Sequence, residues 1–131
     1  GWTGQLCFYR CGYRPPVLHL VDLPGYGHTV GGGGGAEAVT QLRDYVRGRV
    51  VAALCVVLVD ARRGLCHADR RVLRLLQHCR LPAYVVLTKA DLMGEAELGR
   101  SHDVVVQELE ARGLPGRRGG ALGMVSAATG A

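Results

Sequence analysis

From residue 54 onwards, apolar stretches alternate with segments whose apolar residues have helical spacing. Residues 54–59, 84–87 and 122–125 read as strands, and the first of them has the continuous apolar character of a strand buried on both faces of a parallel sheet. Residues 69–79 and 101–111 place apolar side chains three and four positions apart, as amphipathic helices do. This alternation predicts an α/β fold with a doubly wound, mostly parallel sheet.

The first fifty residues are organised differently. Residues 6–9 and 17–21 have the character of strands, and the segment between them is too short for a helical crossover, so we expect one antiparallel strand pair. Five consecutive glycines at 31–35 form either a flexible linker or a mobile switch segment. A helix is expected from residue 36 to about residue 47, where Gly48 ends it. The whole chain of 131 residues is long enough for one domain and too short for two.

Polar or glycine-containing motifs follow several of these strands. Asp-Leu-Pro-Gly at 22–25 follows the second strand, and Thr-Lys-Ala-Asp at 88–91 follows the strand at 84–87. Asp60 and the Ser-Ala pair at 126–127 come at the ends of two more strands. Because open α/β sheets bind ligands at the carboxyl ends of their strands, we expect these residues to share one ligand-binding edge.

An Asp-x-x-Gly motif followed by an [Asn/Thr]-Lys-x-Asp motif is typical of GTPases. Asp22 can hold the hydration shell of a Mg²⁺ ion, and the backbone N–H of Gly25 can approach a γ-phosphate because no Cβ intrudes. Asp91 offers two acceptors to the N1–H and exocyclic amine of guanine, while the stem of Lys89 packs along the base and braces the loop. Alone, each motif would be an ordinary turn or helix cap. In this order, with helical segments between them, they predict a GTPase.

Lys89 is the only lysine in the chain. A Walker A loop, Gly-x-x-x-x-Gly-Lys-[Ser/Thr], needs its own lysine to reach the β- and γ-phosphates. The chain therefore reads as a GTPase domain whose Walker A loop would precede Gly1. Residues 1–131 would then form a single, partial G domain.

The composition bears on the state of the cysteines, on the kind of partner and on membrane insertion. The five cysteines include no Cys-x-x-Cys pair, and we interpret them as reduced, mostly buried thiols of an intracellular protein rather than disulfides or a metal site. The net charge of +5, with arginine supplying all but one of the sixteen basic residues, suits a polyanionic partner such as rRNA. The arginines near the helix at 69–79 form a solvated face or, alternatively, an RNA contact. The longest apolar run, 50–59, is too short to span a bilayer, so no membrane insertion is expected.

Together, these motifs resemble the EngB-type GTPases of the translation-factor-related class. The segments that carry the resemblance are 20–27, 59–64 with Asp69, 88–91 and 126–130. The Leu-Pro-Gly-Tyr-Gly form of the switch II motif and Thr88 in place of the usual asparagine are specific to this group. The resemblance implies a Ras-like P-loop GTPase fold, GTP or GDP as ligand with Mg²⁺, and a role in assembling the large ribosomal subunit. The resemblance also implies that the family's first strand, Walker A loop and first helix precede Gly1 and that its last helix follows Ala131. The glycine run departs from the family, which usually has a charged stretch there.

The resemblance also assigns roles to individual residues. Thr3 stands where the family has its switch I threonine, a Mg²⁺ ligand in the GTP state alongside Asp22. Ser126 and Ala127 would bind guanine O6 through main-chain N–H groups. The nucleotide-binding set is then Asp22, Gly25, Thr88, Lys89, Asp91, Ser126 and Ala127, and the switch residues are Thr3, Pro24, Tyr26, Gly27 and His28.

No residue receives a certain catalytic role. Tyr26 stands where many small GTPases have the glutamine that orients the attacking water. Intrinsic hydrolysis should therefore be slow, or helped by another group or a partner. His28 could orient water, although a solvated loop histidine is the simpler interpretation.

The resemblance implies that the full-length protein is a GTPase acting on the large ribosomal subunit precursor. It would contact rRNA and ribosomal proteins, would be monomeric outside the ribosome, and would couple GTP hydrolysis to binding or release. The alternative is a non-catalytic pseudo-GTPase that binds rRNA as a scaffold. A GTPase acting on membranes or tRNA is a third interpretation. The glycine run and the cysteines favour a mitochondrial location, with the bacterial cytoplasm as the alternative.

Overall fold

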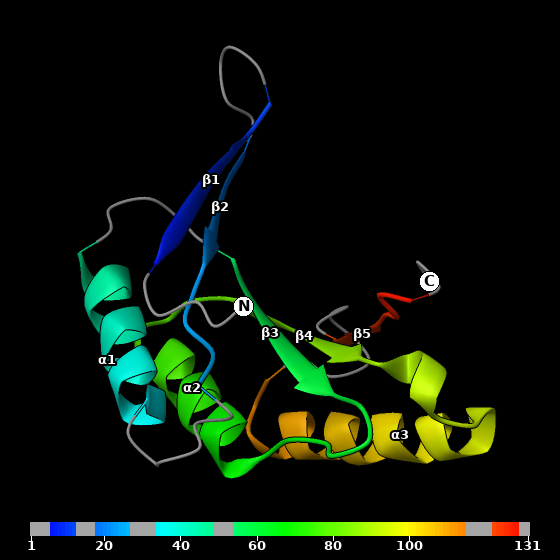
Figure 1. Cartoon of the computed structure of the whole chain (residues 1–131). Helices are drawn as coiled ribbons and strands as arrows, with labels where there is room; N and C mark the ends of the chain where they lie inside the picture. Colours follow the sequence, from blue (N-terminus) through cyan, green and yellow to red (C-terminus); the bar gives the residue numbers. More distant parts are fainter. Residues whose placement is uncertain (1–5, 13–17, 27–33, 49–53, 115–121, 129–131) are drawn as a thin grey trace. The chain divides into compact units, whose positions relative to one another are not determined.

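The computed structural model describes residues 6–12, 18–26, 34–48, 54–114 and 122–128. The elements in chain order are β1 (Cys7–Cys11), β2 (Leu18–Asp22), α1 (Gly34–Arg47), β3 (Cys55–Asp60), α2 (His67–His78), β4 (Ala83–Thr88), the 3₁₀ helix η1 (Ala90–Leu92), α3 (Glu95–Ala111) and β5 (Leu122–Met124) (Figure 1). They fall into two compact units, Gly1–Val50 and Val51–Ala131, which are described separately below.

In the first unit, β1 and β2 pair antiparallel, as the short connection between them predicts. Cys7 lies opposite Asp22, and Cys11 lies opposite Leu18. The ring of Phe8 on β1 contacts the ring of Tyr45 on α1, with centroids 5.8 Å apart. A tilted aromatic pair of this kind adds about 0.5–1.5 kcal/mol beyond the burial of its surface, so it helps to hold the helix against the strand.

Helix α1 begins inside the glycine run. Gly34 and Gly35 are its first two residues, two positions before the start that the sequence predicts. A Cβ on Gly35 would lie 2.8 Å from the carbonyl oxygen of Tyr26, which is closer than real Cβ atoms approach. This contact between the helix start and the turn after β2 therefore requires glycine. Residues 31–33, where the choice between linker and switch segment arises, lie outside the described residues.

In the second unit, β3, β4 and β5 form a parallel sheet in that order, with Asp60 opposite Thr88 and Leu87 opposite Met124. Each connection contains a helix. Because such crossovers are right-handed and the strand order follows the chain, both connections place their helix on the same face of the sheet. Helices α2 and α3 accordingly contact each other through the ion pair between Arg70 and Glu108 (Figure 1).

The expectation that residues 54–59 are buried on both faces is wrong. Val57 and Val59 are buried, whereas Val56 and Leu58 are 54% and 62% exposed. Successive side chains of a strand point to opposite faces, and α2 and α3 cover only one of them. Among the described residues, no helix of this unit covers the other face.

The core of the second unit lies between the sheet and its two helices. The largest fully buried side chains are Leu73 and Leu76 from α2, Leu87, Val59 and Val85 from the strands, and Val105 and Leu109 from α3. Each buried leucine or valine stabilises the fold by about 1.5–3 kcal/mol relative to an exposed one.

The starts of α2 and α3 also differ from the sequence-based expectation. Helix α3 begins at Glu95, six residues before the predicted start, because its first turns are mostly exposed and leave no apolar periodicity. Two acidic residues in the first turn favour that start by complementing the helix dipole. Helix α2 begins at His67, and the carboxylate of Asp69 caps it by accepting a 2.8 Å hydrogen bond from the N–H of Cys66. Among the described helices, none has the length and apolar character needed to cross a membrane.

All five cysteines are in the thiol form. The expectation that they are mostly buried is wrong, because Cys11 is exposed and the other four are half-buried. Cys55 is the first residue of β3 rather than an interior one, and Cys79 follows the last turn of α2. Burial, and secondarily the neighbouring Cys79, raises the pKa of Cys55. In the described part of the chain, no three His, Cys, Asp or Glu side chains are grouped to hold a metal ion.

The carboxylate of Glu108 joins α2 to α3. It accepts hydrogen bonds of 2.6 Å and 3.0 Å from the guanidinium of Arg70, and two of 3.1 Å and 2.8 Å from Arg112 at the end of α3. The Glu108 side chain is 23% exposed. The hydrogen bonds from Arg70 and Arg112 lower the pKa of Glu108 from 4.5 to about 2.

We expect the Glu108→Gln variant to lose stability at neutral pH and to depend less on pH in acid. The folded-state pKa lies below the unfolded-state value, so the contribution is complete above about pH 4.5 and is lost as pH falls through about 2. Removing the charge should lower the free energy of unfolding at pH 7 by about 1–3 kcal/mol. Urea titrations of both proteins at pH 7, 4 and 3 would measure this. An identical acid dependence in the variant would contradict it.

Candidate nucleotide-binding site

Hydrogen bonds tie together the carboxyl ends of the three strands in the second unit. The N–H of Ala61 donates to the carbonyl oxygen of Thr88 at 3.0 Å, and the Thr88 hydroxyl donates to the carbonyl oxygen of Val59 at 3.2 Å. On the other side of β4, the N–H of Val125 donates to the carbonyl oxygen of Leu87 at 2.8 Å. The loops that follow the three strands therefore start from one fixed edge.

The turn after β4 has an uncommon backbone conformation. Lys89 has φ 60° and ψ 33°, in the left-handed region that residues other than glycine seldom occupy. The next residue, Ala90, donates its N–H to the carbonyl oxygen of Val125 at 3.4 Å and begins the single turn of η1. The turn that starts at Lys89 thus places Asp91, which is exposed, just beyond the end of β4. Backbone conformations of this kind occur most often at functional sites.

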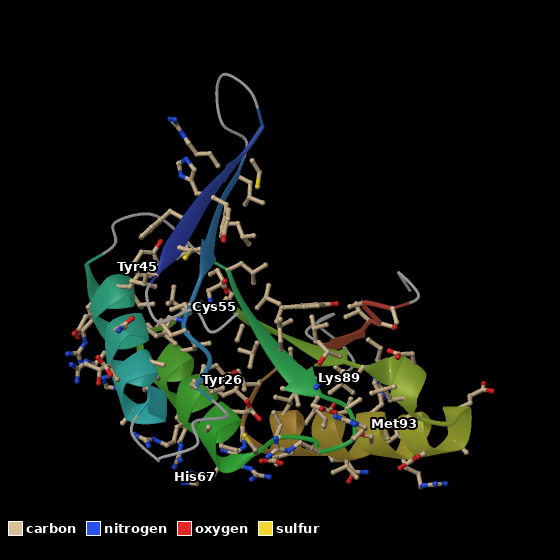
Figure 2. The ribbon with its side chains drawn as sticks, in the orientation of Figure 1. Tyr26, Tyr45, Cys55, His67, Lys89 and Met93 are labelled. Carbon is tan, nitrogen blue, oxygen red and sulfur yellow. The ribbon has the colours of Figure 1, made fainter. Side chains whose placement is uncertain are left out.

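Charged side chains from the loops after β3 and β4 meet at Asp60. Its carboxylate accepts hydrogen bonds from the Nε and Nη2 of Arg62 at 2.9 Å and 2.6 Å, and from the Nζ of Lys89 at 3.1 Å. Figure 2 shows Lys89 at the carboxyl end of β3, where Asp60 lies. Asp60 is only 16% exposed, whereas the two basic side chains are about half exposed. The hydrogen bond from Arg62, followed by that from Lys89, holds the pKa of Asp60 well below its usual range.

Arg62 also lies within electrostatic range of the exposed Asp91. The hydrogen bond and charge of Asp60, with a smaller contribution from Asp91, raise the pKa of Arg62. Asp60 and Asp91 are therefore accompanied at this edge by the cations Arg62 and Lys89. Two of the N–H groups of the Arg62 side chain donate to Asp60.

The loop after β5 adds a closed turn to the same edge. Ser126 is buried, and its hydroxyl oxygen accepts a 3.1 Å hydrogen bond from the N–H of Ala128. Ala127, between them, is exposed. Because Ala90 is bonded to Val125, this turn and the Lys89 turn are held side by side.

The remaining predicted site residues belong to the first unit, which is described by itself. Asp22 is the last residue of β2 in the first unit and is exposed, as is Gly25. No atom lies within 4 Å of where a Cβ of Gly25 would be, so its backbone is open to a ligand. Pro24 is buried and Tyr26 is half-buried. Thr3, Gly27 and His28 lie outside the described residues.

Sequence reasoning placed Asp60 at the ligand-binding edge, and Asp60 and Arg62 lie in a segment that carries the family resemblance, but it assigned neither of them a contact. The pairing of Asp60 with Lys89 joins residues 29 positions apart and depends on the register of β3 against β4. An aspartate at a strand end, two residues before an arginine, was the available local signal. Asp69, which contributes to the family resemblance, caps α2 and has no contact with this edge among those described.

Residues 39–131 match the family model described as the elongation factor Tu GTP binding domain. The match covers more than half of the chain. The chain belongs to this family of GTP-binding domains. The parallel sheet with its crossover helices and the antiparallel strand pair agree with the Ras-like P-loop GTPase fold that the sequence motifs predict.

Bacterial proteins named as probable GTP-binding protein EngB are similar to this GTP-binding domain. That of Rhodospirillum rubrum is 37% identical over 101 residues, which cover 75% of the chain and 44% of the relative. That of Chlorobaculum parvum is 40% identical over 89 residues, which cover 67% of the chain and 46% of the relative. One from Rhodopseudomonas palustris is 35% identical over 112 residues, which cover 83% of the chain and 50% of the relative. These similarities confirm the EngB-type resemblance, and the chain spans about half the length of these relatives.

Among solved structures, the translation elongation factor SelB from Methanococcus maripaludis has a similar fold. Its complex with the GTP analogue GppNHp matches 98% of the chain with a TM-score of 0.69 and 24% sequence identity, and the match covers 25% of SelB. The apo form matches 83% of the chain with a TM-score of 0.60 and covers 21% of SelB. At this identity the likeness concerns the fold alone.

Proposed function

We propose that the full-length protein is a GTPase that uses GTP and GDP with Mg²⁺ and acts on the precursor of the large ribosomal subunit. The observation that carries the proposal is the left-handed Lys89 turn, which is hydrogen-bonded to neighbouring strands and presents Asp91 at the carboxyl edge of the sheet. A turn held this firmly provides fixed hydrogen-bond acceptors, as recognition of a nucleobase requires.

In this function, the second unit recognises the base. The carboxylate of Asp91 accepts hydrogen bonds from the N1–H and exocyclic amine of guanine, and the stem of Lys89 lies along the flat face of the ring. Main-chain N–H groups at Ser126 and Ala127 donate to O6. Thr88 contributes indirectly, since its hydroxyl bonds to Val59 and fixes the start of the turn.

The first unit contributes to phosphate and metal binding. The backbone N–H of Gly25 approaches the γ-phosphate. The exposed carboxylate of Asp22 holds the hydration shell of Mg²⁺, and Thr3 supplies a hydroxyl oxygen. Carboxylate and hydroxyl oxygens are donors that Mg²⁺ accepts, so the exposed Asp22 at a strand end fits the ion. Bound Mg²⁺ neutralises charge that develops on the phosphates.

Hydrolysis by these residues alone is expected to be slow. Tyr26 occupies the position of a water-orienting glutamine, and its phenol has a single O–H donor, whereas a glutamine amide carries an acceptor oxygen and two N–H donors on separate atoms, so a tyrosine does not orient water in the same way. Its backbone carbonyl lies against the start of α1 at Gly35. We therefore expect a partner that contacts switch II (Pro24, Tyr26, Gly27 and His28) to assist hydrolysis.

Charge supports the large-subunit precursor as that partner. The chain has a net charge of +5, carried almost entirely by arginine, and Arg71 and Arg74 on α2 are exposed. Arginine pairs well with the phosphates of rRNA. We place the protein in mitochondria, with the bacterial cytoplasm as the alternative, because of the glycine insertion and the cysteines.

We expect the full-length protein to sediment with precursors of the large subunit in a way that depends on the bound nucleotide. GTP can shift affinity for the particle only if the two nucleotide states contact it differently. Sucrose-gradient sedimentation with a non-hydrolysable GTP analogue, with GDP and without nucleotide would test this. Equal retention in all three conditions, with no nucleotide in the purified particle, would instead support the pseudo-GTPase scaffold.

A further inference from the structure

Asp60 occupies a position that none of the proposed nucleotide contacts uses. It ends β3, directly opposite Thr88 on β4, so its side chain lies beside the start of the Lys89 turn. Four hydrogen bonds converge on its carboxylate. Besides those from the side chains of Arg62 and Lys89, the backbone N–H of Arg62 donates to Oδ1 at 3.1 Å.

We propose that Asp60 is a positioning residue of the guanine site, which anchors the ammonium group of Lys89 and thereby fixes the turn that presents Asp91. The proposal rests on the proposed function, since it assumes that guanine binds at this turn. It assigns Asp60 and Arg62 to the specificity of the site although neither needs to touch the nucleotide.

The bonds of Asp60 suit it to be the fixed partner. Arg62 grips both carboxylate oxygens, and its backbone N–H holds one of them, so the orientation of Asp60 is determined within its own loop. One acceptor direction of Oδ2 then remains for the Nζ of Lys89 at 3.1 Å. Asp60 is mostly buried and already oriented, so its carboxylate can hold the mobile ammonium group of Lys89. The exposed Lys89 side chain could not in turn fix the orientation of Asp60.

Lys89 needs such an anchor. Its side chain is 53% exposed, and a lysine stem loses about 1.5–2 kcal/mol of rotamer entropy when it is ordered. The ion pair with Asp60 imposes part of that order before the nucleotide arrives, so less remains to be lost when the stem lies against the base. It also links the loop after β3 to the loop after β4, across two paired strands.

Arg62 makes this arrangement compatible with base recognition. An unpaired carboxylate at Asp60 would repel the carboxylate of Asp91. The bidentate bond of Arg62 to Asp60 compensates that charge, and Arg62 is also within electrostatic range of Asp91. We therefore expect the balance of charges at this edge to matter for guanine binding.

The test is a double-mutant cycle in the full-length protein, with fluorescent GDP affinity as the readout. Asp60→Asn keeps the shape of the side chain and removes its charge, and should weaken GDP binding about three- to tenfold. In a Lys89→Met background, the same substitution should have little further effect, because the anchored ammonium is already gone. Asp60→Glu, which keeps the charge, should bind GDP more tightly than Asp60→Asn.

Glu108→Gln is the matched control. It also removes a carboxylate that is gripped by arginine, but between α2 and α3 and away from the turn. Glu108→Gln should lower the free energy of unfolding and leave the affinity for GDP within about twofold of the wild-type value. This result would separate an effect on the position of Lys89 from an effect of general stability on GDP binding. If Asp60→Asn does not fold, Asp60→Glu measured with and without Lys89→Met gives the same cycle, and its effect should be smaller in the Lys89→Met background.

The outcomes distinguish this inference from the proposed function. If Asp91→Ala leaves the preference for guanine unchanged, guanine does not bind at this turn and both fail. If Asp91→Ala removes that preference while Asp60→Asn binds GDP like the wild type, the inference alone is overturned. Equal weakening by Asp60→Asn with and without Lys89→Met would also overturn it, because the effect would then not pass through Lys89.

Discussion

Asp91→Ala should abolish the preference of the full-length protein for guanine over adenine nucleotides. A site built to hydrogen-bond particular groups rejects an analogue that lacks them by roughly 10⁴–10⁵-fold, and that discrimination should vanish with the carboxylate. Asp91 is exposed at the end of a fixed turn, so its removal should change binding far more than folding. Competition titrations of GDP against ADP on both proteins would measure the ratio.

A second exposed aspartate gives the control for this experiment. Asp103 lies on α3, away from the strand ends, and its side chain is 51% exposed. Asp103→Ala should keep the guanine preference of the wild type. If Asp91→Ala also kept it, residues 88–91 would have no part in recognising the base.

Leu73→Ala should destabilise the protein by about 2–5 kcal/mol, the largest stability loss we expect from a single substitution. Leu73 is completely buried on α2, where the helix packs on the sheet, and truncation removes apolar contacts and leaves a cavity. Urea-induced unfolding followed by circular dichroism would give the difference in the free energy of unfolding.

Val104→Ala is the appropriate comparison, since Val104 on α3 is 62% exposed. It should change the free energy of unfolding by no more than about 0.5 kcal/mol. A loss below 1 kcal/mol for Leu73→Ala would show that α2 does not pack on the sheet as described.

Much of the fold could be predicted from local sequence patterns. The antiparallel β1–β2 pair followed from a connection too short for a crossover, and α2 followed from apolar residues at helical spacing. The start of α3 was missed because residues 95–100 are mostly exposed and have no apolar pattern. The burial of β3 was also missed, because the face that a crossover helix covers depends on the order of the strands in the sheet.

The candidate site divides in the same way. Thr88, Lys89 and Asp91 could be found from their motif, because a turn after a strand is encoded by consecutive residues. The anchoring of Lys89 by Asp60 could not be found, since it depends on which residues the β3–β4 register places opposite each other. Charge pairs between loops are a property of the sheet rather than of either segment.

The order of β3, β4 and β5 bears on how the second unit acquires its structure. Among the described strands of this unit, β4 pairs with β3 and β5 pairs with β4, so each pairing joins strands that are consecutive in the chain and connected through one α-helix. The entropy of closing each loop stays small, and such topologies fold faster than those with distant pairings. As the chain leaves the ribosome, β3, α2 and β4 can associate before β5 has been synthesised. The loops that meet at Asp60 and Lys89 would then come together early, before the turn at Ser126 exists.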